Sequence, residues 1–412
     1  MIDIKDKADC DGCGACSEKC PSHCICMTED DKGFIYPKTD QKNCINCGLC
    51  NKVCPISSHK TSADNHIGKA YASYNKDGEK RKTASSGGIF QALAEYVIKR
   101  NGCVFGVKFD HEWNTCHECA SNEEEIEPLK RSKYIQSRTN GTFFKAKETL
   151  ESGRIVLYTG TPCQIAGLKA YLGKEYDNLI CMDFICHGVA SPKIWQKYIE
   201  EKRYGLARHY HIKDKSKIVL KSVNFRDKRI SWRMFNLTMT FCINGKDFVE
   251  TTSPVWEDDY MQAFLKDYAN RPSCFNCKFR SGRSGSDLTI GDFWGIEDII
   301  TDKDLTGEGG TSLIIPHNER TNNLIRELDC ALKEMSLEDS IKGNRAYIQD
   351  WSKPKTHDYF FQKIKSNTIR HALEKAERKN FLLQKYELKS TKNLKYRLKY
   401  RILNFLYGKT QQ

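Results

Sequence analysis

Cysteine residues near the start of the chain have the type and spacing needed to bind metal. They form two runs with one pattern, C-x-x-C-x-x-C-x-x-x-C-P. The first run is Cys10, Cys13, Cys16 and Cys20, and the second is Cys44, Cys47, Cys50 and Cys54. Thiolates at this spacing, followed by proline, are typical ligands of 4Fe-4S clusters. A zinc ribbon also uses C-x-x-C pairs, but it usually has two pairs and one spacer rather than two complete runs. The pattern therefore predicts two iron–sulfur clusters.

The fourth cysteine of each run is predicted to bind the cluster of the other run, as in bacterial two-cluster ferredoxins. The first cluster would be held by Cys10, Cys13, Cys16 and Cys54, and the second by Cys44, Cys47, Cys50 and Cys20. Gly12, Gly14 and Gly48 leave room for the backbone to turn its N–H groups toward the sulfides. Two such clusters form an electron relay, and a relay requires an acceptor.

The remaining chain is long enough to supply that acceptor. After a ferredoxin unit of roughly 60 residues, about 350 residues remain, enough for one large domain or two ordinary ones. The 20 cysteines are better explained as ligands in a reducing cytoplasm than as disulfides, because no apolar leader follows Met1. No apolar run approaches the ~18 residues of a membrane-spanning helix. We therefore expect a soluble, cytoplasmic protein.

The net charge of +13 has its clearest concentration near the C-terminus, over residues 389–401. Leu394, Leu398, Ile402 and Phe405 recur there at helical spacing between basic residues. Such a helix could rest on an anionic membrane surface or on a partner protein, or pack on its own domain. A nucleic-acid partner is not expected, because the sequence shows no helix-turn-helix and no basic platform interleaved with aromatic residues.

Composition divides the chain into four segments. We expect a ferredoxin domain over 1–58, a polar linker over 59–69, a larger domain over 70–353 and a basic helical tail over 354–412. In the larger domain, strands and helices alternate, which predicts an α/β fold with a central sheet flanked by helices. With the ferredoxin domain in front, the whole chain is α+β.

The larger domain begins with a strand at 70–74, followed by the turn Ser85-Ser86-Gly87-Gly88 and a predicted helix over 89–98. Serine and glycine at a helix start can let a phosphate approach the positive end of the helix dipole. The same residues can also serve as a plain helix cap. Both interpretations are open from the motif alone.

Two later units share one plan of strand, tight loop and helix. A strand at 154–158 leads to Cys163, and a strand at 179–185 leads to Cys186-His187-Gly188. Such repeats imply parallel strands, whose carboxyl ends gather at one rim of a sheet. Cys163 and Cys186 are therefore expected at the same rim.

A C-x-x-C pair, Cys274 and Cys277, lies on a later turn. With the two rim cysteines it would supply the four thiolates of another cluster, although zinc binding or simple core packing would use the same residues. A second pair, Cys116 and Cys119, alternates as a strand does and is interpreted as incidental thiols rather than a zinc site. Cys24 and Cys26 are interpreted in the same way.

Several motifs occur together in one order. They are Ser85-Ser86-Gly87-Gly88, Ser132-Lys133-Tyr134, Gly160-Thr161-Pro162-Cys163-Gln164, Cys186-His187-Gly188, Phe225-Arg226-Asp227-Lys228, Cys274-x-x-Cys277 and Gly291-Asp292-Phe293-Trp294-Gly295. This string resembles the beta-subunit family of coenzyme F420-reducing hydrogenases and dehydrogenases. The resemblance runs from about residue 70 to 313, with the ferredoxin module in front.

The resemblance implies a flavoprotein that carries FAD, with FMN the less expected alternative, and a third 4Fe-4S cluster near the flavin. The cluster would fall on Cys163, Cys186, Cys274 and Cys277. Ser86, Gly87 and Gly88 would contact the flavin phosphates, with Lys133 and Tyr134 nearby, and Ser85 and Asp292 are further candidate cofactor contacts. His187 would be either a proton donor at the flavin or a neighbour that tunes the cluster.

The expected activity is that of an iron–sulfur flavoprotein oxidoreductase. Clusters pass single electrons, and a flavin converts them into the electron pair that an organic substrate needs. The expected partners are an electron donor or acceptor protein, such as ferredoxin, and a small organic substrate. The alternative is an electron-transfer subunit without its own substrate that docks to a catalytic partner.

Overall fold

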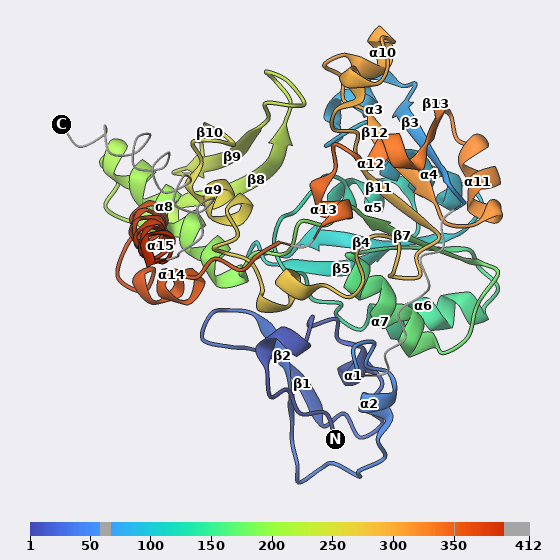
Figure 1. Ribbon diagram of the computed structural model, residues 1–412, viewed down its shortest axis with the longest axis horizontal. Helices are drawn as coiled ribbons and strands as arrows, with labels where there is room; N and C mark the ends of the chain where they lie inside the picture. Colours follow the sequence, from blue (N-terminus) through green and yellow to red (C-terminus); the bar gives the residue numbers. More distant parts are fainter. Residues whose placement is uncertain (58–66, 350, 391–412) are drawn as a thin grey trace.

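A computed structural model describes residues 1–57, 67–349 and 351–390, which Figure 1 shows as coloured ribbon. Most of the expected linker lies outside the described residues. The expected amphipathic helix with Leu394, Leu398, Ile402 and Phe405 lies outside them as well. Within the described part of the chain, no helix is long and apolar enough to cross a membrane.

The N-terminal unit contains two similar one-turn helices. Helix α1 (Ala15–Glu18) follows Gly14, whose φ is 83°, and α2 (Leu49–Lys52) follows Gly48, whose φ is 73°. Glycine takes this backbone conformation without steric cost, so the glycine in each cysteine run is required by the turn that starts the helix. The two halves of the sequence pattern therefore fold alike.

An antiparallel hairpin of β1 (Ile25–Glu29) and β2 (Ile35–Thr39) completes this unit, which lies at the bottom of Figure 1. Its small core consists largely of cysteine side chains packed with Ile2 and Ile25. A unit of this size rarely has enough apolar core to be stable alone, and bound metal is one of the ways in which small domains compensate.

The larger domain is built on a mixed eight-stranded sheet with the strand order β13-β3-β12-β11-β7-β6-β4-β5. Its strands are β3 (Lys69–Asn75), β4 (Cys103–Phe109), β5 (Thr115–Ala120), β6 (Val156–Thr159), β7 (Leu179–Phe184), β11 (Leu288–Asp292), β12 (Ser312–Pro316) and β13 (Cys330–Ser336). Strands β4, β6, β7 and β11 pair in parallel. The remaining pairs are antiparallel.

Helices cover both faces of this sheet. Helices α4 (Ile89–Ile98) and α11 (Glu319–Arg326) pack on one face, where Leu157 of β6 points. Helices α6 (Thr142–Glu151) and α7 (Pro162–Leu172) pack on the other face, against Tyr158. Neighbouring residues of β6 thus belong to different cores, as a strand covered on both sides requires. The predicted α/β fold is confirmed, and α4 has the predicted bounds.

A second sheet, of three antiparallel strands, stands beside the first (Figure 1). Its strands are β8 (Ile218–Asp227), β9 (Asn236–Ile243) and β10 (Asp247–Pro254). The helices that pack with it are α8 (Pro192–His209), α9 (Asp259–Leu265), α14 (His357–Lys363) and α15 (Ile369–Ser390). Phe360, Ile369 and Ala376 are fully buried in this core. The first part of the segment expected as a tail is therefore a component of the folded protein.

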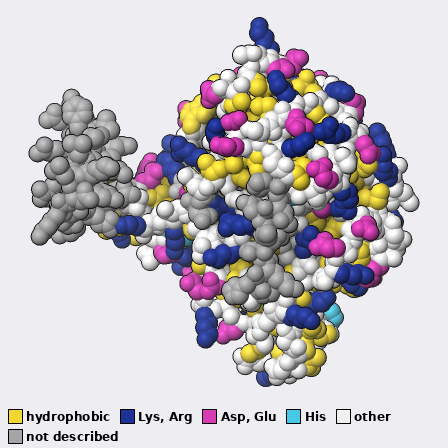
Figure 2. Space-filling model, turned by 45° about the vertical axis from the view of Figure 1, so that its right-hand side comes forward, with side chains coloured by type: hydrophobic (Ala, Val, Ile, Leu, Met, Phe, Trp, Pro, Cys, Tyr) yellow, Lys and Arg dark blue, Asp and Glu magenta, His cyan; other side chains and the backbone are white. Residues whose placement is uncertain are grey.

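Short elements fill the connections. They are α3 (Gly78–Thr83), α5 (Glu123–Ile126), α10 (Lys303–Thr306), α12 (Leu337–Ile341), α13 (Arg345–Ile348) and the 3-10 turns η1 (Lys7–Asp9), η2 (Glu127–Leu129), η3 (Lys215–Lys217), η4 (Pro272–Asn276) and η5 (Ile296–Asp298). On the face shown in Figure 2, basic and acidic side chains are interspersed over the described surface.

Candidate metal centres and cofactor site

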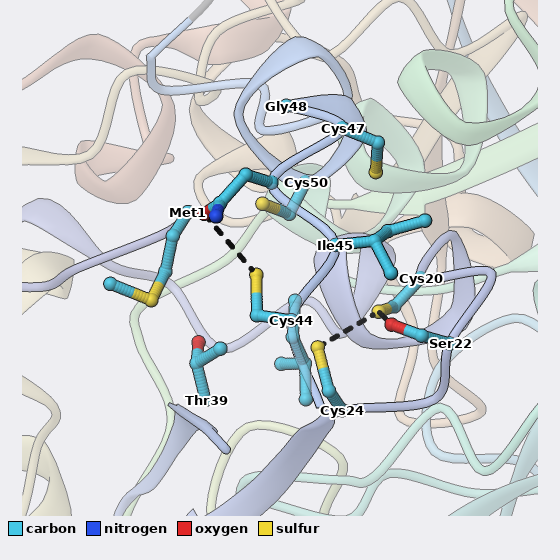
Figure 3. Close-up of a pocket in the computed structure, with 12 residues that line it drawn as sticks. Met1, Cys20, Ser22, Cys24, Thr39, Cys44, Ile45, Cys47, Gly48 and Cys50 are labelled. Atoms are coloured by element: carbon cyan, nitrogen blue, oxygen red, sulfur yellow. Dashed lines mark hydrogen bonds between the residues drawn. The ribbon is translucent and has the colours of Figure 1, made fainter. Parts of the chain in front are cut away.

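The structure gathers the cysteines of the N-terminal unit around two cavities. The first cavity is lined by Cys10, Cys13, Cys16 and Cys54. The second cavity is lined by Cys20, Cys44, Cys47 and Cys50 (Figure 3). In each cavity, three cysteines come from one run and the fourth from the other run, which is the crossed grouping expected from the spacing. We call these the first and the second cysteine site.

The first cysteine site has surroundings that suit a bound cluster. Burial raises the pKa of Cys10 and Cys13, and it raises the pKa of Cys16 to about 12. The backbone N–H groups of Gly12 and Ala15 oppose this rise at Cys10 and Cys13. Backbone N–H groups directed at the sulfurs favour the thiolates that iron requires, so metal binding would release protons here.

The second cysteine site has one exposed ligand position. Cys47 is exposed, and the side chain of Ile45 between the ligand positions is 65% exposed. Cys24 lines the same cavity, with its Sγ 3.4 Å from Cys20 Sγ (Figure 3). Among the described residues, no three His, Cys, Asp or Glu side chains lie close enough together to hold a single metal ion. A four-iron cluster is larger than a single metal ion, so its four cysteine ligands lie farther apart. The spacing of the cysteines around the two cavities suits such a cluster.

A third group of cysteines lies in the larger domain. Cys163 is in the first turn of α7 after β6, and Cys186 follows β7. Strands β6 and β7 are parallel, with Thr159 opposite Met182, so the predicted placement of these two cysteines at one rim is confirmed.

The C-x-x-C pair completes this group. Cys274 lies in the turn η4 and Cys277 ends it. The N–H of Arg271, which precedes η4, donates to Val189 O, so η4 lies beside the loop after Cys186. The pKa of Cys163 is raised by burial and by charge on Asp11, Cys277 and Cys186. The pKa of Cys186 is raised by burial and by charge on Cys274 and Cys277. The four sulfurs therefore interact, and we call them the third cysteine site.

Asp11, between Cys10 and Gly12, reaches toward the third site. Its charge raises the pKa of Cys163, Cys274 and Cys277. Burial raises the pKa of Asp11 itself, while the Ser273 hydroxyl and the Arg271 guanidinium lower it. Sequence reasoning gave Asp11 no role, because the residue is close to the third site only in the folded chain.

The Ser85–Gly88 turn follows α3 and caps the start of α4 without a side-chain hydrogen bond. The N–H of Gly87 donates to Ser312 Oγ at 3.0 Å, and a Cβ there would lie 2.5 Å from Ser73 O. The close approach of the turn to β3 and β12 requires glycine at this position, and the phosphate contact stays a prediction. Gly88 has a φ of 89°, which glycine favours.

The turn of Lys133 and Tyr134 lies against the Ser85 turn, since Ser132 N donates to Ser85 Oγ at 2.9 Å. Burial and the charge of Arg131 lower the pKa of Lys133 to about 7. Its Nζ donates to Lys130 O at 2.8 Å. In the described chain, Lys133 forms no ion pair with a carboxylate. A buried amine of this kind fits a site for an anionic ligand.

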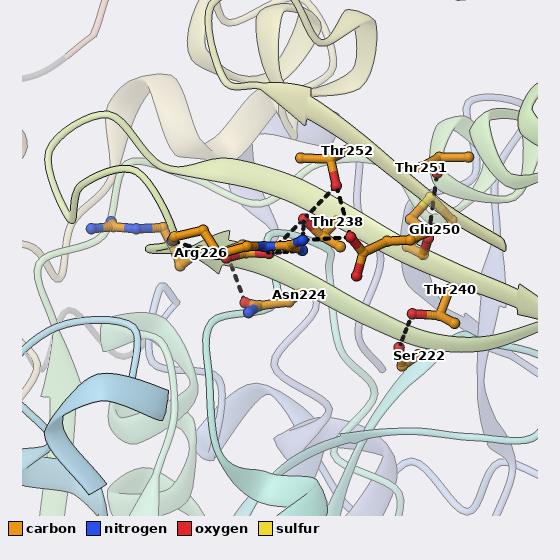
Figure 4. A network of polar contacts seen from close by, with 11 residues as sticks. Ser222, Asn224, Arg226, Thr238, Thr240, Glu250, Thr251 and Thr252 are labelled. Carbon is orange, nitrogen blue, oxygen red and sulfur yellow. Dashed lines mark hydrogen bonds and ion pairs between the residues drawn. The ribbon is translucent and has the colours of Figure 1, made fainter. Parts of the chain in front are cut away.

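Two residues of the Phe225–Lys228 motif join this region, although sequence reasoning assigned them no role. Arg226 pairs with Asp292 at 2.6 Å and lies 3.4 Å from Tyr134 Oη. Its side chain extends from β8 away from Thr238 and Glu250 (Figure 4). Lys228 Nζ donates to Ser86 O at 3.0 Å and to Arg81 O at 2.7 Å. Burial and the charge of Arg226 lower the pKa of Lys228 to about 8.

Several polar atoms near this pair are buried without a hydrogen-bond partner among the described residues. They are Arg226 Nε, Asp292 Oδ1 and Trp232 Nε1. Buried polar atoms normally find partners, so these atoms fit the polar edge of a bound organic group. The donors and cations around Ser85, Lys133 and Arg226 are therefore compatible with a flavin nucleotide.

His187 lies between the rings of Phe264 and Trp351, at centroid distances of 5.0 and 4.8 Å. Its Nε2 is 3.1 Å from Asp267 Oδ1. Asp267 Oδ1 also accepts from Asn270 Nδ2, which belongs to the segment leading to η4. These contacts make His187 a neighbour of the loops of the third site, and its role as a proton donor or as a residue that tunes the cluster stays a prediction. Cys116 and Cys119 lie on β5, where Cys119 packs with Cys103.

Comparisons with known proteins are consistent with this geometry. Residues 153–339 match the family model for the C-terminal part of the beta subunit of coenzyme F420 hydrogenase/dehydrogenase, and residues 9–58 match a "4Fe-4S dicluster domain". The third cysteine site and Asp292 lie inside the first match, whereas the Ser85 and Lys133 turns precede it. No curated protein sequence matches the chain.

A solved structure of the F420-reducing NiFe hydrogenase complex from Methanosarcina barkeri contains a similar chain. The two chains have 16% sequence identity and a TM-score of 0.42, over 78% of this chain and 93% of that one. The family matches therefore assign residues 153–339 to the C-terminal part of the coenzyme F420 hydrogenase/dehydrogenase beta-subunit family and residues 9–58 to a 4Fe-4S dicluster domain.

Proposed function

We propose that this protein is an iron–sulfur flavoprotein oxidoreductase that carries a third 4Fe-4S cluster and one FAD. The proposal is supported by where the two regions lie on the large sheet. The third cysteine site and the cationic Ser85–Lys133 region lie beyond the carboxyl ends of β6, β7, β11 and β3, and these strand ends share one edge of the sheet. Ligands of open α/β sheets bind at such an edge.

The bound groups would supply a specific kind of chemistry. A flavin exchanges single electrons with clusters and an electron pair with an organic substrate. The protein would contribute the binding and orientation. Cys163, Cys186, Cys274 and Cys277 would hold the third cluster. The α4 N-terminus, Lys133 and Lys228 would face the flavin phosphates, and the Arg226–Asp292 pair would orient a polar edge of the cofactor.

We expect two kinds of partner, an electron-carrying protein at the second cysteine site and a small substrate at the flavin. The exposed Cys47 and Ile45 give an electron-carrying protein, such as a ferredoxin, access to the second cysteine site. The substrate would be a small organic molecule that accepts or donates an electron pair. The same exposure supports a second candidate function, an electron-transfer subunit that passes electrons to a catalytic partner. Turnover of a small acceptor by the purified protein alone would favour the oxidoreductase.

Flavin binding is tested by Lys133→Met, with Lys82→Met as the matched control. Lys82 is an exposed lysine on α3 beside the same turn. Hydrogen bonds to charged groups contribute about 1.5–3 kcal/mol, so Lys133→Met should weaken flavin binding by about tenfold or more. Lys82→Met should retain the cofactor, and the iron content of both variants should match wild type. Full flavin occupancy and unchanged affinity in Lys133→Met would remove Lys133 from the site.

A further inference from the structure

The loop of the first cysteine site is fastened to the larger domain by a buried arginine. Arg271 is 1% exposed and immediately precedes η4, which carries Cys274. Its Nε and Nη2 donate to Cys10 O at 2.9 and 2.7 Å. The guanidinium also lies 4.0 Å from the ring centroid of Tyr36. One side chain thus joins the loop of the first site to the turn of the third.

A glycine of α7 makes the second close approach. A Cβ on Gly167 would lie 2.9 Å from both Cβ and Sγ of Cys13. Helix α7 begins at Pro162, so the same helix carries Cys163 in its first turn. Glycine is unfavourable inside a helix, so its use here is explained by the space that Cys13 needs.

Among the described residues, the glycine of the second cysteine site has no comparable contact. A Cβ on Gly48 would meet nothing within 4 Å, whereas one on Gly12 would lie 2.6 Å from Gln136 and one on Gly14 2.5 Å from Thr139. Gln136 and Thr139 belong to the larger domain. In the described part of the chain, the glycines of the first site therefore lie against that domain, whereas Gly48 of the second site does not.

We propose that Arg271 and Gly167 are positioning residues that hold the first cysteine site against the third, so that the first site, not the second, is the junction between the N-terminal unit and the larger domain. This inference rests on the proposed function for the chemistry of the third site. The contacts of Arg271 with Cys10 and of Gly167 with Cys13 do not depend on that chemistry.

The packing is tested with two glycine variants of the full-length protein. Gly167→Ala would place a methyl group against Cys13, whereas Gly205→Ala, inside α8, would meet nothing within 4 Å. Hydrogen exchange over residues 9–17 should become faster in Gly167→Ala and stay unchanged in Gly205→Ala. Exchange over residues 41–52 should be unchanged in both variants. Unchanged exchange over 9–17 in Gly167→Ala would overturn the role of Gly167.

The charge of Arg271 is tested by the reduction potentials of the two N-terminal clusters, followed by EPR. A nearby positive charge favours the reduced cluster, so Arg271→Gln should lower the potential of the first cluster and leave that of the second unchanged. Arg271→Lys should restore most of the shift. Arg138→Ala is the control for a positive charge at the same border, because this half-exposed arginine is paired with Glu29 and reaches Met27 O beside the first site instead of the backbone of a cysteine, so its loss should shift the potential less.

The outcomes separate this inference from the proposed function. Equal shifts of both potentials in Arg271→Gln, or an equal shift in Arg138→Ala, would overturn the junction at the first site. Iron analysis of wild type that gives about eight atoms would instead remove the third cluster. Even in that case, the reduction potentials of the two N-terminal clusters would still show whether the charge of Arg271 acts on the first cluster. If Arg271→Gln does not fold, Arg271→Lys and Gly167→Ala together decide the question.

Discussion

The first and second cysteine sites share one ligand pattern but differ in their surroundings. The first is lined by Ile2, Ile4 and Met27 and is packed against the larger domain. The second has Cys47 and Ile45 exposed. The identical spacing predicts the same set of ligands for each site, while the neighbouring side chains decide which site has an exposed ligand position and which is packed against the larger domain.

The largest expected effect distinguishes the two sites by loss of their ligands. Cys13→Ala and Cys47→Ala should each lose about four iron atoms, one cluster's content. Both should stop flavin reduction by an external ferredoxin, while direct reduction by dithionite persists. Only Cys13→Ala should also speed hydrogen exchange in α7, because Cys13 packs on Gly167. If hydrogen exchange in α7 also became faster in Cys47→Ala, the two cysteine sites would not differ in their packing on the larger domain.

A smaller effect is expected in the resistance of the two clusters to metal removal. An iron chelator with a mild oxidant should remove the second cluster before the first, because the one exposed cysteine of the two sites, Cys47, belongs to the second site. The order is read from iron content and EPR signal over time, with Cys47→Ala as the reference that lacks the second cluster. If both clusters were lost at the same rate, the two cysteine sites would not differ in their exposure to the chelator.

The sequence was sufficient wherever short-range patterns determine the structure. Cysteine spacing predicted the crossed grouping of Cys20 and Cys54, and alternating strands and helices placed Cys163 and Cys186 at one rim. The helix over 89–98 was recognisable from its apolar periodicity alone.

The sequence was insufficient where residues meet only through tertiary packing. Asp11 and Arg271 are 260 positions apart and carry no local signal of their meeting at the third site. Gly87 carries no local signal of its close approach to Ser73 and Ser312, which requires glycine there. The three-stranded sheet β8–β10 was also missed, because only the end of β8, at Phe225–Asp227, falls within the motifs that guided the prediction.

The most direct test is iron analysis of anaerobically purified wild type beside a double variant, Cys274→Ala with Cys277→Ala. The third cysteine site predicts about twelve iron atoms in wild type and about eight in the variant, with the EPR signals of the N-terminal clusters retained. About eight atoms in both proteins, with identical spectra, would contradict a third cluster.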